Sequence, residues 1–343
     1  MNIRECLCFD DVLLVPKFST LKSRKDANLW SELTEEHSLE IPIMASPMDT
    51  VTDVDMAYAM FMHGGLGVVH RYNSIEDQAA VIAALSDADV SPIAAAVGAT
   101  GDFLERAQVL IAHGANILCI DIAHGHHLLM KNALRVLRGA LGEKVHLMAG
   151  NVATLQAFND VADWGADSIR VGVGGGSCCL TRVATGHGVP TFQSILDCSQ
   201  TDRDVLLIAD GGIKNSGDIT KAIAAGADFV MLGSLLAGTD ESPGEIVTNH
   251  TSGKKYKYFR GMASRKAQVD WRGRSSTPEG VSTMIPYKGP VEEILNDLKG
   301  GLASGVSYSG AFSLKDFRRN AEFIKQTSSG IAESQAHILR GGE

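Results

Sequence analysis

Residues 226–234 read Gly-Ala-Asp-Phe-Val-Met-Leu-Gly-Ser, a glycine suited to ending a helix, then an apolar run of strand length and a short polar loop. A glycine tolerates the positive φ that often follows a helix, so the chain can leave the helix here and enter the apolar run. A continuous apolar run suits a parallel strand that is buried on both faces. The same Gly-Ala pair precedes an apolar run at residues 114–117 and 165–168, which indicates a repeated helix–strand unit.

Short apolar runs of this kind alternate with segments of helical length along most of the chain. The predicted strands are residues 41–45, 67–69, 93–97, 117–122, 145–149, 168–173, 206–209 and 229–232. Clear helical segments are residues 75–85, 103–112, 128–141 and 155–164. Eight such units predict an α/β fold of the (β/α)8 TIM-barrel class, because a closed barrel leaves no unpaired sheet edge. The alternative is an open, doubly wound sheet.

After the last predicted strand, residues 244–288 are polar and show no clear periodicity. Long segments of this kind are usually lids or binding loops, and in a barrel the segments that follow strand ends gather at the catalytic face. We therefore predict one catalytic barrel domain over residues 1–343, with a long mobile flap at 244–288 and no second domain.

Composition limits the possible partners and location. The chain has 343 residues, 31 basic and 40 acidic, for a net charge of −9, and no basic block, which argues against nucleic-acid or anionic-membrane binding. The first residues carry charges where a signal peptide needs an apolar stretch, and no apolar run is long enough to span a membrane. The six cysteines lack paired spacing, so we expect free thiols in the cytoplasm.

The densest group of chemically useful residues is 171–182, after the sixth predicted strand. Its glycines let the backbone bend tightly and present amide groups to a ligand. It is not a dinucleotide fingerprint, because Ser177 stands where the third glycine is needed. Cys179 is a candidate nucleophile, with a buried structural cysteine as the alternative, whereas Cys178 is expected to be structural.

Other candidates stand at the ends of further predicted strands. Gly211-Gly212 and Gly233-Ser234 follow strands seven and eight, where barrel enzymes usually bind phosphate. Asp210 can accept hydrogen bonds from a sugar hydroxyl, and the alternative is a helix N-cap.

Strands one and four offer two more groups. Residues 46–50 provide a hydroxyl and a flexible apolar side chain, with Asp49 also readable as a helix cap. Asp121, at the fourth strand's end, is expected to contact a ligand. Three nearby histidines, His124, His126 and His127, have no carboxylate or thiol at a suitable helical spacing, which argues against a metal site.

Together these motifs resemble the IMP dehydrogenase/GMP reductase family almost end to end. The matching stretches are residues 9–16, 46–50, 150–152, 172–182, 210–213, 233–238, 260–262, 278–280, 286–289 and 300–302. The resemblance implies that Cys179 attacks C2 of a purine nucleotide to form a covalent adduct. It also implies catalytic roles for Thr181, whose hydroxyl would assist transfer of water or ammonia, and for Glu279.

The resemblance also implies the binding residues. Phosphate, ribose and base of the nucleotide would be held by Ser46, Met48, Ser177, Asp210, Gly211, Gly212, Gly233, Ser234, Gly261, Met262 and Ala263, with Glu279 also reading the base. A nicotinamide cofactor would contact Asp121, Ala123 and Asn151.

The sequence departs from the usual family pattern at two positions of the cysteine loop. Gly175 stands where a proline is usual, and Leu180 stands where a threonine is usual. The regulatory CBS pair is absent, since residues 70–73 lead directly into the next helix.

The flap bears on which branch of the family the chain resembles. A dehydrogenase uses an adjacent Arg-Tyr pair on the flap to activate water, but residues 263–278 contain Arg272 and Arg274 and no tyrosine. This favours a GMP reductase that converts GMP to IMP and ammonia with NADPH. Residues 46–48, 185–190 and 330–335 look closer to dehydrogenases, so a CBS-less IMP dehydrogenase using NAD to form XMP is the alternative. A barrel lyase or isomerase acting on a phosphorylated sugar, and a non-catalytic nucleotide sensor, are more remote alternatives.

The same resemblance implies a homotetramer and a possible K⁺ site. The cation would bind Gly174, Gly176 and Cys179, together with Glu333 and Ser334 from a neighbouring subunit. Gln335 replaces the histidine that is usual next to this pair.

Overall fold

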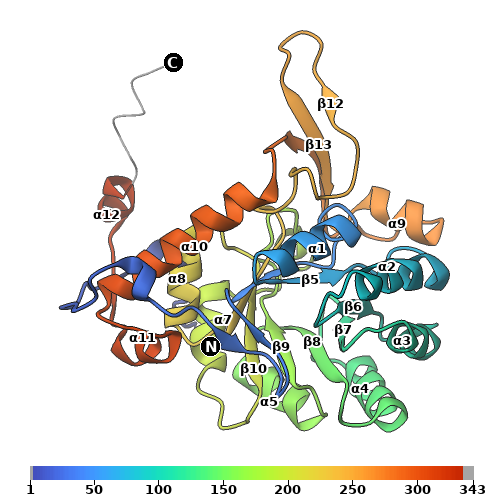
Figure 1. The fold of residues 1–343 in the computed structure, drawn as a ribbon, viewed down its shortest axis with the longest axis horizontal. Helices are drawn as coiled ribbons and strands as arrows, with labels where there is room; N and C mark the ends of the chain where they lie inside the picture. Colours follow the sequence, from blue (N-terminus) through green and yellow to red (C-terminus); the bar gives the residue numbers. More distant parts are fainter. Residues whose placement is uncertain (1–2, 335–343) are drawn as a thin grey trace.

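The computed structural model describes residues 3–334 and contains a closed barrel of eight parallel strands surrounded by helices (Figure 1). In order around the barrel, the strands are β4 (Ile43–Ala45), β5 (Leu66–Val69), β6 (Ala94–Val97), β7 (Ile117–Asp121), β8 (His146–Val152), β9 (Ser168–Val171), β10 (Leu206–Asp210) and β11 (Phe229–Leu232). The last strand pairs with the first, with Val230 beside Ile43 and Leu232 beside Ala45. The predicted TIM barrel is confirmed, and the open sheet is wrong.

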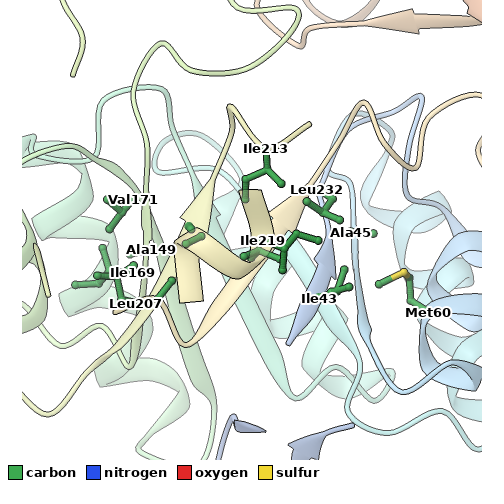
Figure 2. Close-up of a cluster of buried hydrophobic side chains, with 14 of the residues drawn as sticks. Ile43, Ala45, Met60, Ala149, Ile169, Val171, Leu207, Ile213, Ile219 and Leu232 are labelled. Atoms are coloured by element: carbon green, nitrogen blue, oxygen red, sulfur yellow. The ribbon is translucent and has the colours of Figure 1, made fainter. Parts of the chain in front are cut away.

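Helices follow the strands and cover the outside of the barrel. They are α1 (Val54–Met62), α2 (Ile75–Asp87), α3 (Phe103–Ala112), α4 (Leu128–Leu141), α5 (Leu155–Asp163), α7 (Thr191–Cys198), α8 (Ser216–Ala224) and α10 (Val291–Tyr308). Their apolar faces form one buried layer with the outward side chains of the strands. Figure 2 shows Met60 of α1 and Ile219 of α8 in this layer with Ile43 and Leu232, which come from barrel strands.

A second apolar cluster fills the barrel interior. It contains Met44, Ala94, Ile117, Met148, Ile208 and Phe229 among others, together with Leu33 and Leu39. These two leucines belong to a hairpin of β2 (Ser31–Glu32) and β3 (Ser38–Leu39), which is tied to the residue before β11 by a bond from Ser31 Oγ to the Asp228 carbonyl. The hairpin therefore closes the N-terminal end of the barrel and leaves the C-terminal end for the site.

The remaining short elements flank the barrel. They are η1 (Phe9–Asp11), β1 (Val12–Leu14), η2 (Arg24–Asp26), α6 (Thr181–Thr185), α11 (Leu314–Asn320), β15 (Phe323–Lys325) and α12 (Ser328–Glu333). Strands β1 and β15 pair in an antiparallel arrangement, so a segment near the N-terminus lies beside one near the C-terminal end of the described chain. None of the helices in residues 3–334 combines the length and the apolar character that crossing a membrane requires.

The flap segment has regular structure, although its sequence shows no clear periodicity. It forms a three-stranded antiparallel sheet of β12 (Val247–Thr248), β13 (Lys255–Arg260) and β14 (Ser282–Pro286), with α9 (Arg265–Arg272) between the last two strands. Figure 1 shows the β12–β13 hairpin projecting from the barrel. The period-two pattern of β13 is hidden because Lys257 occupies an inward position, where its ammonium donates to the carbonyls of Thr239 and Ser242.

Candidate active site

A cavity of about 480 Å³ opens at the C-terminal ends of the barrel strands. Its volume lies within the range of about 300–1,000 Å³ that is usual for small-molecule sites. The following residues, predicted from sequence to be catalytic, ligand-binding or in the subunit's own part of the K⁺ site, all line it: Ser46, Met48, Asp121, Ala123, Asn151, Gly174, Gly176, Ser177, Cys179, Thr181, Asp210, Gly211, Gly212, Gly233, Ser234, Gly261, Met262, Ala263 and Glu279. The structure thus brings these residues together, while their individual roles stay predictions.

Three of these side chains form a continuous hydrogen-bonded chain. The Cys179 thiol donates to Thr181 Oγ1 at 3.1 Å, and the Thr181 hydroxyl donates to Glu279 Oε2 at 2.9 Å. The backbone N–H of Thr181 also points to the Cys179 sulfur at 3.5 Å and would stabilise negative charge there. A thiol, a hydroxyl and a carboxylate in this order can pass a proton from sulfur to Glu279.

Backbone pairing holds Glu279 against the cysteine loop. The Leu180 N–H donates to the Glu279 carbonyl at 2.7 Å, and the Val281 N–H donates to the Cys178 carbonyl at 3.0 Å. Gly280 lies between these two bonds, and a Cβ there would stand 3.0 Å from the Ser264 nitrogen. A side chain at residue 280 would therefore push these segments apart.

The neighbouring cysteines differ in environment. Cys178 is 7% exposed, and burial raises the pKa of its thiol. Cys179 is only partly buried and faces the cavity. A buried thiol with a raised pKa is inert, so the accessible sulfur is the one available for chemistry.

Arg170 is the main site residue that sequence reasoning missed. Its guanidinium donates to Asp121 Oδ1 at 2.7 Å and to Asp210 Oδ2 at 2.8 Å, and the side chain lies inside the barrel at 5% exposure. Burial alone would raise the pKa of Asp121, but the charges of Arg170 and Arg71 outweigh it and hold that pKa below its usual value. Asn151 also donates to Asp210 Oδ2, at 2.8 Å. The signal for Arg170 was a charged residue two positions before Gly172, between the apolar residues of a predicted strand.

Arg71 and Tyr72, in the loop after β5, are two further missed residues on the Asp121 side of the cavity. The Arg71 guanidinium donates to the Asp121 carbonyl at 3.2 Å and lies 4.9 Å from the Tyr72 ring centroid. Its Nε is buried and has no hydrogen-bond partner in residues 3–334. This side of the cavity therefore offers an unused donor beside a carboxylate.

Two glycine loops meet on the other side of the cavity. Gly211 and Gly212 have φ values of +90° and +80°, which favour glycine. A Cβ on Gly211 would lie 3.1 Å from the Gly176 nitrogen. The loops after β9 and β10 therefore contact each other through their backbones, with no side chain between them. Asn215 caps α8 with its side chain. The helix-cap alternative for Asp210 is therefore wrong.

Asp49 connects the barrel to the flap. The Arg260 guanidinium on β13 donates to Asp49 Oδ2 at 2.9 Å and also contacts Asp270 on α9. The cap of α1 is Asp53. The helix-cap alternative for Asp49 is wrong, and the residue instead fixes the base of the flap.

The histidine group after β7 has structural contacts. His126 Nε2 lies 2.8 Å from Asp160 Oδ2, and its ring stacks on Trp164. His127 caps α4 by accepting from the Leu129 N–H. Within residues 3–334, no group of three or more His, Cys, Asp or Glu side chains is arranged to hold a metal ion.

Helix α9 adds cavity residues that the sequence did not indicate. Gln268 is 7% exposed, donates to the Ala263 carbonyl at 3.0 Å and accepts from the Ser276 N–H at 2.7 Å. It thereby ties together the two chain segments on either side of α9, one leading from Met262 and the other to Glu279. Arg272, at the end of the helix, also lines the cavity.

The residues expected from a neighbouring subunit lie elsewhere. Glu333 ends α12, and Ser334 follows it with its hydroxyl bonded to the Gly330 carbonyl. Neither residue lines the cavity of its own chain. The cation site and the tetramer stay predictions, and Gln335 lies outside the described residues.

Comparison with known proteins gives the family context of this site. The family described as "IMP dehydrogenase / GMP reductase domain" matches residues 6–337. The chain is 33% identical to an inosine-5'-monophosphate dehydrogenase from Nitrosopumilus maritimus, over 98% of this chain and 99% of that protein. It is 32% identical to a GMP reductase from Leishmania major, over 98% of each chain. Its fold matches the crystal structure of a GMP reductase variant from Trypanosoma brucei in complex with guanosine 5'-monophosphate, with a TM-score of 0.91, 32% identity and 98% coverage of each chain.

Proposed function

Because the chain belongs to the IMP dehydrogenase/GMP reductase family of oxidoreductases, we propose that it is a GMP reductase, which converts GMP to IMP and ammonia with NADPH. One observation carries the choice of branch: the flap brings Glu279 to the Thr181 hydroxyl, and the segment 263–278 that precedes it contains no tyrosine. A relay that starts at the Cys179 thiol can hand the thiol's proton to a departing amine, which suits the release of ammonia. Hydrolysis of the adduct would instead require a separate base to activate water.

The relay can supply the proton that the departing amine needs, because it takes up the proton that Cys179 loses. Cys179 forms a bond to C2 of GMP while its proton passes through Thr181 to Glu279 and the π electrons of the C2–N3 double bond move to N3. The same proton returns through Thr181 to the 2-amino group, the C2–N3 double bond re-forms, and the bond from C2 to that amino nitrogen breaks to release ammonia. The purine is then attached to sulfur, and loss of the thiolate after C2 is reduced gives IMP. The thiolate recovers its proton through the relay from solvent.

The nucleotide is oriented by groups around the sulfur. The glycine loops and the Ser177 and Ser234 hydroxyls line the phosphate end, and Asp210 accepts from the ribose hydroxyls. Base contacts come from Met262 and Ala263 and from the Ser46 and Met48 side. Accurate placement is the main contribution of such residues, because the reaction needs C2 held next to one sulfur atom.

A nicotinamide cofactor fits the Asp121 side of the cavity. The buried Arg71 Nε, which has no hydrogen-bond partner within residues 3–334, provides a donor there, the Asn151 amide oxygen provides an acceptor, and Ala123 leaves room beside them. When bound, a reduced nicotinamide supplies the hydride that replaces sulfur at C2. The protein's own part is to orient this group and to exclude water from the adduct.

The remaining proposals concern assembly and environment. K⁺ would bind carbonyls of Gly174, Gly176 and Cys179, and the Gly176 carbonyl keeps a free lone pair beside its bond to the Cys179 N–H. Glu333 and Ser334 would complete that site within a homotetramer. We also propose a cytoplasmic location.

Absorbance at the nicotinamide band tests the proposed reaction. With GMP and NADPH we expect oxidation of the cofactor and release of ammonia, and with IMP and NAD we expect no NADH. The second candidate, IMP dehydrogenase, is favoured by the dehydrogenase-like residues 46–48 and 185–190, and NADH formation would establish it. The Cys179→Ala variant should lose turnover in either case, whereas a lyase or isomerase would be little affected.

A further inference from the structure

The charged side chains of the cavity are unequally paired. Three acidic groups, Asp121, Asp210 and Glu279, and three arginines line it. Arg170 bridges the two aspartates, and Arg71 lies 3.7 Å from Asp121. The third arginine, Arg272, has no carboxylate within 4 Å among residues 3–334. It is the cavity's free positive charge in a chain whose net charge is −9.

Packing places Arg272 near the Asp121 side. Its neighbour Trp271 meets the Tyr72 ring edge to face, with centroids 5.9 Å apart, and Tyr72 adjoins Arg71 in the loop after β5. Helix α9 ends directly after Arg272 at Gly273, whose φ is +68°. The last helical turn is therefore held over the half of the cavity that carries Arg71, the donor proposed for the cofactor.

A cofactor phosphate bound in the Asp121 half of the cavity would need a positively charged partner. The chain lacks the glycine fingerprint by which a helix N-terminus binds a dinucleotide pyrophosphate, because Ser177 stands at its third glycine. A guanidinium binds phosphate oxygens through paired N–H groups and keeps its charge at all relevant pH values. The nucleotide's own phosphate has the glycine loops after β10 and β11. We propose that Arg272 binds a phosphate group of the dinucleotide cofactor and so contributes to the choice of cofactor, an inference that rests on the proposed oxidoreductase function.

Binding can be measured without turnover in the Cys179→Ala background. The full-length protein, saturated with GMP, is titrated calorimetrically with NADPH and then with NADH, before and after Arg272→Gln. We expect NADPH to bind at least about tenfold more weakly in the Arg272→Gln protein, since a charge-assisted bond to phosphate is lost. Arg272→Lys should recover part of the loss, because it restores the charge without the paired geometry.

Arg274→Gln is the matched control. Arg274 lies two residues further on, is exposed and does not line the cavity. We expect its removal to change the affinity for NADPH less than twofold, and both variants to keep the affinity of the parent protein for GMP within twofold.

Each outcome has a defined meaning. A loss confined to NADPH assigns Arg272 to the additional phosphate of that cofactor, and an equal loss for NADH assigns it to the shared pyrophosphate. Unchanged binding of both dinucleotides, an equal effect of Arg274→Gln, a loss confined to GMP, or absence of dinucleotide binding in the parent would overturn the proposal. If the wild-type chain oxidises IMP with NAD instead, the reductase proposal fails, but the same titrations with IMP and NAD still decide the role of Arg272.

Discussion

The buried polar side chains at the two ends of the barrel interior differ in charge. Strand β9 contributes Ser168 and Arg170, two residues apart, to the same inward face. At the C-terminal end, Arg170 forms ion pairs with Asp121 and Asp210. At the N-terminal end, Ser168 Oγ lies 2.8 Å from His146 Nε2 in a pair that carries no charge when the imidazole is neutral.

This difference follows from what each end has to do. Buried charges are costly unless they are paired and hydrogen-bonded, so a barrel filled only for stability would avoid them. The cavity end keeps the buried Arg170 because its charge holds Asp121 and Asp210, the two carboxylates proposed to contact the ligands. At the closed end no ligand enters, and burial lowers the pKa of His146 to about 4, which keeps it neutral. Of these interior polar groups, the charged ones therefore lie at the end with the cavity and the uncharged pair lies at the closed end.

The largest expected effect comes from removing the cation that both carboxylates share. Arg170→Met leaves the largely buried Asp121 and Asp210 side chains, 17% and 15% exposed, without their main partner, and breaking a buried pair in this way costs about 3–5 kcal/mol. We expect the free energy of unfolding to fall by that amount in urea titrations followed by tryptophan fluorescence. The affinities for nucleotide and for dinucleotide should both fall, because the two carboxylates lose a common orientation.

An exposed arginine provides the control for this substitution. Arg203 pairs with Asp163 at 3.0 Å on the surface, and such pairs contribute less than about 1 kcal/mol. Arg203→Met should therefore change stability little. If the two variants are equally stable, the carboxylates at the barrel mouth do not depend on Arg170, and the contrast between the two ends is lost.

The barrel was predictable because its signals are local and repeated. The strand at residues 229–232 and the helices at 103–112 and 128–141 were predicted with the bounds that the structure has. Strand β8 runs three residues beyond its apolar run, to Val152, because Gly150 still pairs with Arg170 and, after a register shift at Asn151, Val152 pairs with Val171. The flap strands escaped prediction because an inward lysine, Lys257, is compensated by carbonyls from a distant loop.

The site was predictable wherever a residue stands at a strand's end. Barrel geometry gathers those ends, so Cys179, Asp210 and Asp121 were expected to meet. Arg170 was missed because its role depends on two partners from other strands, and sequence spacing alone does not show such pairing. Gln268 and Arg272 were missed for a related reason, since the fold of the flap places them over a cavity formed by the barrel.

The second prediction concerns acid. The pKa of His146 in the folded protein is about 4, against an ordinary value of 6.5, because of burial. Between these values the unfolded chain binds a proton that the folded chain does not, so stability is lost as pH falls from 6.5 towards 4, by about 3 kcal/mol in total. Asp121, whose lowered pKa keeps it ionised in the folded protein, adds to this loss only near the acid end of the range, where the unfolded chain begins to protonate that carboxyl around its ordinary value of 3.8.

His146→Gln isolates this contribution, since the amide can still bond to Ser168. We expect the difference in unfolding free energy between wild type and His146→Gln to change in favour of the variant as pH is lowered from 7.5 to 4.5. Parallel curves for the two proteins would show that His146 is not held neutral. The neutral character assigned to the closed end would then be wrong.

The smallest effect is expected from the other half of that pair. Ser168 is fully buried, and Ser168→Ala leaves the His146 Nε2 without its partner, which costs about 1–2 kcal/mol at pH 7.5. In a His146→Leu background the same substitution should cost less, because there is no longer a polar atom to leave unpaired. Neither residue lines the cavity, so kcat and KM should stay within twofold of wild type. A large fall in kcat would mean that packing at the closed end positions the charged cluster above it, and the two ends of β9 would have to be treated as one unit.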